Sequence, residues 1–417
     1  MVISSSTGTH RRTAADEVVD QQETRQNYLD GRYHDWPNEA GFVGLTEHRG
    51  PAKLHVNGTI PAYAAGALYR TGPGVGELET AERGTYYVSH WFDGFAHTHR
   101  FDIAASHTPG GETTVTYSSR RQGEKYIEQV KKRGWRAGIT FAQRSDPCVA
   151  LYAKAMARFD KSIDNNVVVL RNVPGLTETV TAASGHRSVS TDSLVVTTDA
   201  TLFQILDKDT LEVVDTGSQE RFHPDLKGPL SMSHAQLDDE TGDMFNVNLT
   251  LGRSPTYRFF RVNAKSGTTD IIATVAGRGV SPAYIHSFFL TKSYVVLCIP
   301  SSHLAWAGAK IAWTGNLLEA MKPFDKSARC QWIVVDRRHG AGVVARDDGD
   351  GGRGATDSSE PRLCALRDNG THVCGVLRRD LEPPGRRGQV LGTKGRGGGH
   401  GAALCTPALH HADHQAD

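Results

Sequence analysis

Short runs of β-branched and aromatic residues recur along most of this 417-residue chain, and they constrain its fold more than any other feature. The runs are separated by Gly, Asp, Asn and Pro, which favour turns and interrupt strands. This pattern is typical of an all-β protein. The clearest predicted strands are 113–117, 167–170, 193–197, 245–249, 294–299 and 332–335.

Repeated turns support the same fold class. Four similar segments begin at Asp207, Asp238, Asn263 and Asp336, and three of them have Gly four residues later. The Asp or Asn side chain accepts hydrogen bonds from the backbone of such a turn, and Gly adopts the positive φ that precedes the next strand. Many hairpins of one kind favour a β-propeller or a β-sandwich, and the turns alone do not distinguish the two.

The two ends of the chain differ from this body. Residues 1–40 are polar and poor in apolar periodicity, which predicts a mobile N-terminal arm. Residues 347–417 contain no Phe, Tyr, Trp, Ile or Met. Such a tail buries too little surface to offset the entropy of ordering, so we expect it to be disordered. The folded body is therefore expected at 41–346.

The composition changes inside a predicted hairpin, just after 335–346. A domain boundary rarely falls in such a place. A frameshift or a misread splice site in a GC-rich gene would explain the change, because GC-rich codons read out of frame give Gly, Ala, Arg and Pro. A genuine disordered tail is the alternative. The genomic sequence beyond codon 346 separates the two: if neither other frame restores aromatic-rich strands, the frameshift hypothesis is wrong.

Charge and cysteine usage exclude some classes of function. Lys and Arg total 47 and Asp and Glu total 46, so the chain lacks the basic surplus that a nucleic-acid-binding surface needs. The sequence has neither a secretory signal nor a run of about 18 apolar residues. Six cysteines without a Cys-x-x-Cys pair are typical of free thiols in a reducing compartment. We expect a cytoplasmic protein that binds no nucleic acid.

One stretch, 148–159, has helical rather than strand periodicity. Its larger apolar side chains recur at spacings of three and four residues. Such a helix either packs against the core or docks at a membrane interface. The candidate membrane-docking residues are Val149, Tyr152, Met156 and Phe159.

Two histidines occupy informative places. His234 precedes a turn and an aromatic strand, and His286 precedes another apolar run. Neutral imidazole is a good ligand for Fe, Cu and Zn, and a propeller points the side chains at its strand beginnings toward a central axis. A lone histidine in such a place is more often a hydrogen-bonded structural residue. The residue pattern alone leaves both roles open.

Six segments of the body match the motifs of one known family in the expected order. They are 66–74 (GALYRTGPG), 90–94 (HWFDG), 99–102 (HRFD), 141–148 (FAQRSDPC), 164–168 (DNNVV) and 198–201 (TDAT). On these segments the chain resembles the carotenoid cleavage oxygenases, which include β-carotene-cleaving enzymes, the retinoid isomerase of the eye, and fungal carotenoid and stilbene cleavers. The resemblance covers about 280 consecutive residues, from Gly66 to Arg346.

The resemblance implies a seven-bladed β-propeller with iron(II) on its axis, held by four histidines. It assigns His234 as the first ligand and His286 as the second. Asp199 falls where the family has an acidic residue, usually Glu, that accepts a hydrogen bond from the other ring nitrogen of a ligand and fixes its tautomer. His90 corresponds to a histidine that is not a ligand, and we expect it to pack against its neighbours.

The implied reaction is the oxidative cleavage of a conjugated C=C bond in a carotenoid or apocarotenoid by O2, giving two carbonyl products. The partners would be an apolar polyene and O2, with peripheral membrane contact through helix 148–159. A stilbene-cleaving dioxygenase is an alternative, because the choice of substrate depends on the shape of a tunnel that the sequence does not show.

The third and fourth ligands of the family have no counterpart in this sequence. The third would fall near residue 358, inside the tail, and His410 and His411 come too late and lack flanking aromatic residues. Two ligands hold iron(II) far more weakly than four. We therefore expect an incomplete propeller of about four to five blades with a short helical insertion, and no activity from this chain. A noncatalytic propeller fragment is the alternative from another class.

Overall fold

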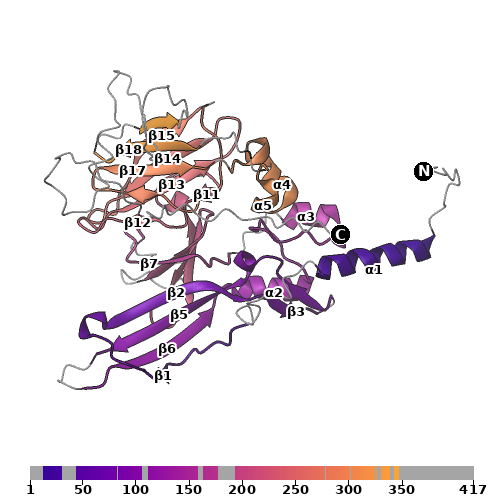
Figure 1. Cartoon of the computed structure of the whole chain (residues 1–417), viewed down its shortest axis with the longest axis horizontal. Coiled ribbons are helices and arrows are strands. Elements are labelled where there is room, and N and C mark those ends of the chain that lie inside the picture. Colours follow the sequence, from indigo (N-terminus) through magenta and orange to yellow (C-terminus); the bar gives the residue numbers. More distant parts are fainter. Residues whose placement is uncertain are drawn as a thin grey trace, which may run out of the picture.

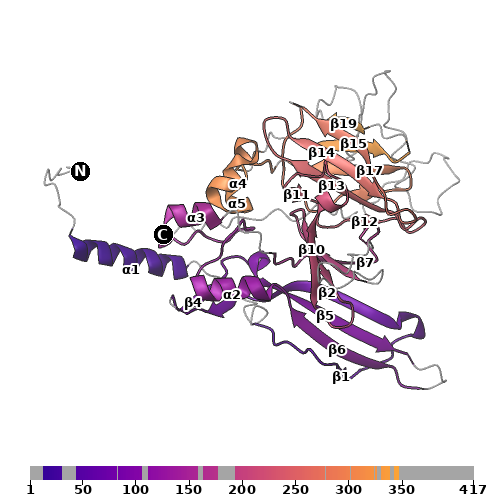
Figure 2. The same ribbon diagram turned by 180° about the vertical axis from the view of Figure 1, so that it is seen from behind.

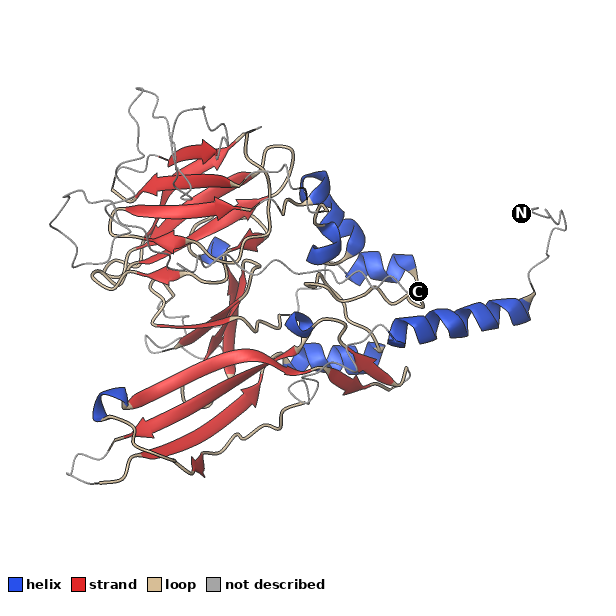
Figure 3. Cartoon of the chain, in the orientation of Figure 1, coloured by secondary structure: helices blue, strands red, loops and turns tan. Residues whose placement is uncertain are grey.

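The computed structural model is built mostly of antiparallel strands, so the all-β prediction is confirmed (Figures 1 and 3). The expected tail at 347–417 and Phe159 lie outside the described residues. The structure describes residues 13–30, 44–81, 83–105, 111–157, 163–176, 193–277, 279–300, 302–323, 325, 330–338 and 342–346.

Helix α1 (Ala14–Asp30) occupies part of the expected N-terminal arm and was not predicted. A capping box starts it: the Thr13 N–H donates to Asp16 Oδ2 at 2.7 Å, and the Asp16 N–H donates to Thr13 Oγ1 at 3.3 Å. Val18 and Val19 are about half exposed, so these two side chains do not pack into a core. Figures 1 and 2 show α1 projecting from the body.

The first sheet has the strand order β1-β6-β5-β2, and a separate ribbon pairs β3 with β4. Gly74 allows the β2 backbone to approach β5, because a Cβ at this position would lie only 2.4 Å from the Cβ of His97. The strands are β1 (Ala52–Leu54), β2 (Gly66–Val75), β3 (Glu77–Glu79), β4 (Thr85–Tyr87), β5 (Phe95–Ala104) and β6 (Thr114–Arg121).

Three more antiparallel sheets follow along the chain. The second has the order β10-β9-β8-β7, the third β11-β13-β14-β15 with β12 also paired to β13, and the fourth β16-β17-β18-β19. Every predicted strand falls in one of these four sheets. The strands of the second sheet are β7 (Val168–Arg171), β8 (Leu194–Thr197), β9 (Leu202–Leu206) and β10 (Val213–Ser218). Those of the third are β11 (Leu230–Ser231), β12 (Gln236–Leu237), β13 (Met244–Thr250), β14 (Thr256–Val262) and β15 (Thr269–Ala276). Those of the fourth are β16 (Phe289–Leu290), β17 (Tyr294–Ile299), β18 (Gln331–Asp336) and β19 (Gly342–Arg346).

The predicted turns have the expected chemistry. Oδ1 of Asp207 accepts hydrogen bonds from the backbone N–H groups two and three residues later, at 3.0 and 2.8 Å, and Asp238 and Asn263 do the same. Gly242 and Gly267 have φ of 75° and 68°. The turn that lacks Gly places Leu211 at φ 58° instead, where a fully buried side chain stabilises the strained backbone.

The helices lie outside the sheets. The predicted helix at 148–159 begins later in the structure, at Leu151, because Cys148 and Val149 belong to a turn in which the Cys148 N–H donates to Asp146 Oδ1 at 2.8 Å. This helix is α3 (Leu151–Ala157). The other helices were not predicted individually. They are α2 (Glu124–Arg133), α4 (Ala309–Thr314) and α5 (Leu317–Ala320).

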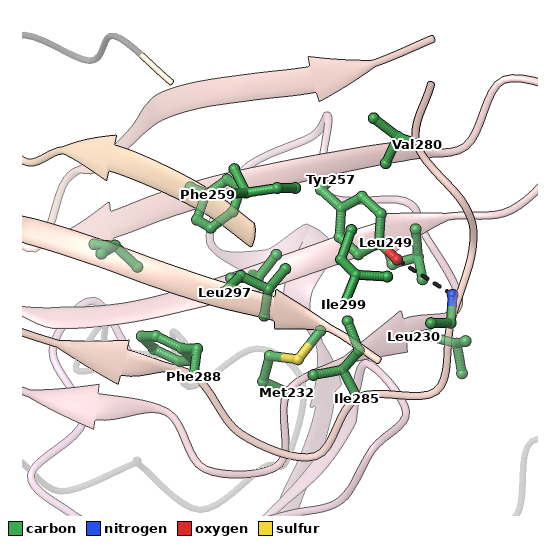
Figure 4. Packing of buried hydrophobic residues seen from close by; sticks show 14 of the residues in the cluster. Leu230, Met232, Leu249, Tyr257, Phe259, Val280, Ile285, Phe288, Leu297 and Ile299 are labelled. Atoms are coloured by element: carbon green, nitrogen blue, oxygen red, sulfur yellow. Dashed lines mark hydrogen bonds between the residues drawn. The ribbon is translucent and has the colours of Figure 1, made fainter. Parts of the chain in front are cut away.

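Apolar side chains fill the spaces between successive sheets. One cluster joins the second sheet to the third through Phe203 and Phe260, and a larger cluster joins the third to the fourth through Phe259 and Leu297. Figure 4 shows this larger cluster, in which the Tyr257 hydroxyl also accepts a hydrogen bond from a backbone N–H. The second, third and fourth sheets therefore pack against their neighbours in chain order, as in radially arranged β folds.

Candidate metal centre

Three chain segments that are distant in sequence meet at the beginnings of strands. Asp199 follows β8, and its carbonyl accepts a hydrogen bond from the Ser231 N–H at 2.8 Å. His234 lies between β11 and β12, and its N–H donates to the carbonyl of His286 at 3.5 Å. The backbone itself thus places the second, third and fourth sheets beside one another at this point.

The two predicted histidines face each other. Their ring centroids are 4.5 Å apart and the ring planes are inclined at 79°. Because a ring nitrogen lies about 1 Å from its centroid, no nitrogen of one ring can be more than about 7 Å from a nitrogen of the other. The rings of His234 and His286 are therefore close enough to share one small ligand.

Asp199 holds the second of these rings, as expected. Its Oδ1 accepts a hydrogen bond from Nδ1 of His286 at 2.7 Å and another from the Ser233 hydroxyl at 3.0 Å, and its Oδ2 accepts one from the Tyr284 hydroxyl at 2.6 Å. Asp has a shorter side chain than the Glu that the family usually has here. Three donors around the carboxylate fix its position despite this shorter reach.

Ser233 is fully buried and touches several acceptors at once. Its hydroxyl oxygen is 3.1 Å from the carbonyl of His286 and 3.0 and 3.4 Å from Nδ1 and Nε2 of the same ring. One hydroxyl hydrogen serves only one acceptor, and a carboxylate is the strongest of those present. The Nε2 contact is at the long limit for a hydrogen bond, so the Nε2 lone pair of His286 remains available.

His234 has a different partner. Its Nδ1 is 2.7 Å from the hydroxyl oxygen of Ser287, the residue that directly follows His286. Burial, and secondarily the neighbouring His286, lowers the pKa of His234. The hydrogen bond to Asp199 raises the pKa of His286 against the opposing effect of burial. The two imidazoles thus differ in electrostatics although they share one site.

The donor set fits a metal of the kind that imidazole binds. Both Nδ1 atoms are engaged by hydrogen bonds, which leaves the two Nε2 atoms as candidate donors, and neutral imidazole suits Fe, Cu and Zn. Within the described residues, no group of three or more His, Cys, Asp or Glu side chains is placed to hold a metal ion. The part of the site that the structure describes therefore offers two nitrogen donors.

Three residues of this site had not been assigned a role from the sequence. Ser233, Tyr284 and Ser287 each lie within two residues of a predicted ligand. Their spacing carried no signal, because a hydroxyl next to a histidine is common and its partner depends on the tertiary structure.

His90 packs, as the resemblance implied. Its ring lies 4.9 Å from those of Phe92 and Phe141, and its Nδ1 accepts the Phe92 N–H at 3.2 Å. The nearby Asp93 carboxylate accepts the backbone N–H groups of Phe141 and Ala142 at 2.8 and 2.7 Å. The motifs at 90–94 and 141–148 therefore stabilise each other.

The candidate membrane-docking residues do not form one stripe. Val149 is buried at 7% exposure, so the docking role expected for it is wrong: it precedes α3 and faces the core. Tyr152 and Met156 are 77% and 55% exposed on α3. Trp306 and Trp313, which the sequence analysis did not consider, are 63% and 69% exposed.

No helix in the described part of the chain is both long and apolar enough to cross a membrane.

The fold and the site define an all-β protein of successive antiparallel sheets with a histidine pair where two of its sheets begin. The chain belongs to the family described as retinal pigment epithelial membrane protein, the carotenoid oxygenase family, whose sequence profile matches residues 42–350.

Curated relatives agree with this assignment. Torulene dioxygenase of Fusarium fujikuroi is 52% identical over 347 residues, covering 81% of this chain and 60% of that protein. Carotenoid dioxygenase of Neurospora crassa is 46% identical over 396 residues, covering 87% of this chain and 64% of that protein. The chain thus spans about three fifths of the length of these relatives.

Solved structures show the same fold at low identity. A variant of Synechocystis apocarotenoid oxygenase has a TM-score of 0.52 at 18% identity, covering 73% of this chain and 57% of that one. A chimera of that oxygenase and RPE65 has a TM-score of 0.51 at 19% identity, with the same coverage.

Proposed function

We propose that this chain is part of an iron(II)-dependent dioxygenase that cleaves a conjugated C=C bond of a carotenoid or apocarotenoid. The observation that carries the proposal is the pair of facing imidazoles, His234 and His286, each held at Nδ1 by a hydrogen bond. Relatives that cover most of the chain are torulene and carotenoid dioxygenases, which supports the substrate class. A cobalt-substituted form of Synechocystis apocarotenoid oxygenase supports a metal in the family.

The residues of this chain would bind and orient the metal. His234 and His286 would donate through Nε2, while Asp199 keeps the proton of His286 on Nδ1 and so holds the lone pair on the other nitrogen. Iron(II), when bound, would supply the redox chemistry that activates O2. In the overall reaction the C=C bond breaks and each oxygen atom of O2 ends in one of the two carbonyl products.

We further propose that the chain by itself is inactive and is an incomplete propeller. The four sheets correspond to four blades of the seven that the family resemblance implies. Two imidazoles hold iron(II) weakly, because lost ligands also lose the geometry that keeps a coordination position open. Formation of a carbonyl product by this chain alone would contradict the proposed inactivity.

Metal binding tests the site directly. Co(II) titration of the whole chain should show one site that His234→Ala and His286→Ala each weaken at least about tenfold. The matched control is His223→Ala, a histidine outside the pair whose Nδ1 accepts a backbone N–H at 3.2 Å. Equal affinity in all four proteins would show that the pair does not hold the metal.

Membrane contact is also proposed, through a surface formed by Tyr152, Met156, Trp306 and Trp313, called here the aromatic surface. Residues of α3 and α4, Lys154 and Thr314, line one shared cavity, and Figures 1 and 2 show the two helices beside each other. Exposed tryptophan and tyrosine favour the interface of a bilayer. Such contact would give access to an apolar polyene.

The proposed function has two alternatives, one in the substrate and one in the class of protein. A stilbene is the alternative substrate, because the choice depends on the shape of the substrate tunnel, and product analysis with both substrate classes distinguishes the two. A noncatalytic fragment or pseudoenzyme would retain at most residual binding of a lipid, and the Co(II) titration would then show no site at the histidine pair.

A further inference from the structure

The two imidazoles of the pair are fixed by chemically different partners. His286 donates to a carboxylate, Asp199, which accepts hydrogen bonds and cannot donate one when ionised. His234 meets the hydroxyl of Ser287, which can either accept or donate. The tautomer of His286 is therefore dictated by its partner, whereas that of His234 depends on which way the hydroxyl points.

We propose that Ser287 is a positioning residue that accepts the Nδ1–H of His234 and so keeps the Nε2 lone pair of that ring free for a metal. The proposal rests on the proposed function, in which the pair holds the metal. In the opposite arrangement the hydroxyl would donate to Nδ1, Nε2 would carry the proton, and His234 could not be a ligand.

The exposure of Ser287 favours the accepting arrangement. The residue lies at the surface, so water can accept its hydroxyl hydrogen while the oxygen lone pair accepts from the imidazole. An imidazole binds a metal through a ring nitrogen that carries no proton, so one of the two tautomers of His234 must be selected.

One short segment of the chain positions both predicted ligands. In the segment 284–287, Tyr284 donates to the carboxylate that holds His286, His286 is itself a ligand, and Ser287 holds the other ligand. Four consecutive residues thus set the orientation of both rings. A shift of this segment would misplace both donors together, whereas the loss of the Ser287 hydroxyl should affect His234 alone.

Co(II) affinity of the full chain is the first readout. Ser287→Ala should weaken Co(II) binding about tenfold, as other changes to hydrogen-bond partners of metal ligands do. Ser287→Asp should restore it, because a carboxylate can only accept from Nδ1. The matched control is Ser293→Ala, a half-buried serine in the turn between β16 and β17, which should leave the affinity unchanged. Equal unfolding midpoints for all variants would exclude a structural cause.

The tautomer is the second readout and needs no metal. In the metal-free protein with 15N-labelled histidine, the ring signals assigned through His234→Asn should show a protonated Nδ1 in the wild type and in Ser287→Asp. In Ser287→Ala they should shift toward a mixture of tautomers. Unchanged tautomers and unchanged Co(II) affinity in Ser287→Ala would overturn the proposal.

The two readouts separate this proposal from the proposed function. If neither His234→Ala nor His286→Ala changes Co(II) binding, the metal does not use the pair and the proposed function fails, whatever the tautomer. If both histidine variants lose the metal while Ser287→Ala keeps its affinity and its tautomer, only the role of Ser287 is wrong.

Discussion

The third and fourth sheets meet through an apolar seam, whereas the first and second sheets meet through a more polar one, called here the polar seam, which contains only a small apolar cluster around Tyr69. In the apolar seam, Phe259 of the third sheet and Leu297 and Ile333 of the fourth are fully buried. At the polar seam, Arg100 pairs with Asp209 at 2.8 Å and Arg120 pairs with Glu212 at 3.1 Å, and both acidic partners are more than a third exposed.

The polar seam also contains buried polar groups. The Asp164 carboxylate, 2% exposed, accepts the Ala96 N–H of the first sheet at 3.0 Å. The next residue, Asn165, donates to carbonyls of Val196 and Leu202 in the second sheet at 3.0 Å. This motif, noticed in the sequence as DNN, joins the two sheets by hydrogen bonds.

The two seams should contribute differently to the free energy of unfolding and to its dependence on pH. A fully buried large apolar side chain contributes about 1.5–3 kcal/mol, and this contribution is independent of pH and nearly independent of salt. A partly exposed ion pair contributes about 0–1 kcal/mol. The apolar seam should therefore stabilise the fold, and the polar seam should make it respond to pH.

Phe259→Ala should have the largest effect. The ring is fully buried in β14 between the third and fourth sheets, so its loss leaves a cavity and should lower the free energy of unfolding by about 3–5 kcal/mol. Urea unfolding at pH 7 measures this free energy. Phe289→Ala in the fourth sheet, where the ring is 54% exposed, is the matched control and should change it by less than about 0.5 kcal/mol. Similar losses in both variants would contradict the seam comparison.

Asp164→Asn should have the next largest effect, and it should appear only in the pH dependence. Burial raises the pKa of Asp164 to about 6, against the opposing charge of Arg136. The folded state then binds more protons than the unfolded state between pH of about 4 and 6, so the free energy of unfolding should rise as the pH falls through this window. The side-chain amide of the variant cannot titrate, and this rise, on the order of 3 kcal/mol, should be lost.

Urea unfolding at pH 7 and pH 4 measures the effect, and His97→Phe provides a control of opposite sign. His97 is fully buried, and burial lowers its pKa to about 4, so protonation of the unfolded state should destabilise the fold as the pH falls below about 6.5. His97→Phe should remove that loss. If Asp164→Asn keeps the wild-type pH dependence, the buried carboxylate is not its source.

Trp313→Ser should have the smallest effect on stability. The side chain is 69% exposed on α4, so the free energy of unfolding should change by less than about 0.5 kcal/mol, in contrast to the equally aromatic but buried Phe259. If the aromatic surface contacts membranes, the variant should sediment less with phosphatidylcholine vesicles than the wild type. Phe289→Ala should sediment as the wild type does. Undiminished sedimentation of Trp313→Ser would remove this tryptophan from the proposed contact.

Much of the fold was predictable because its signals are local. Strands such as 294–299 were read from consecutive β-branched residues, and the turn at Asp238 was read from an Asx side chain with Gly four residues later. Helix α1 was missed because residues 1–40 are poor in the apolar periodicity from which helices are predicted. The aromatic surface was missed because Trp306 and Trp313 have no periodic partners, and their exposure depends on what packs nearby.

The candidate site was likewise predictable only in part from the sequence. The sequence by itself determined that His234, His286 and Asp199 are the residues to compare, because the histidines precede predicted strands and Asp199 lies in a segment that resembles a family motif. Only the tertiary structure decided that the two rings face each other at 4.5 Å, that Asp199 holds one of them and that Ser287 holds the other. It also decided that Val149 is buried. The physical reason is that strand formation depends on neighbours along the chain, whereas hydrogen-bond partners and burial depend on segments that meet only when the sheets pack together.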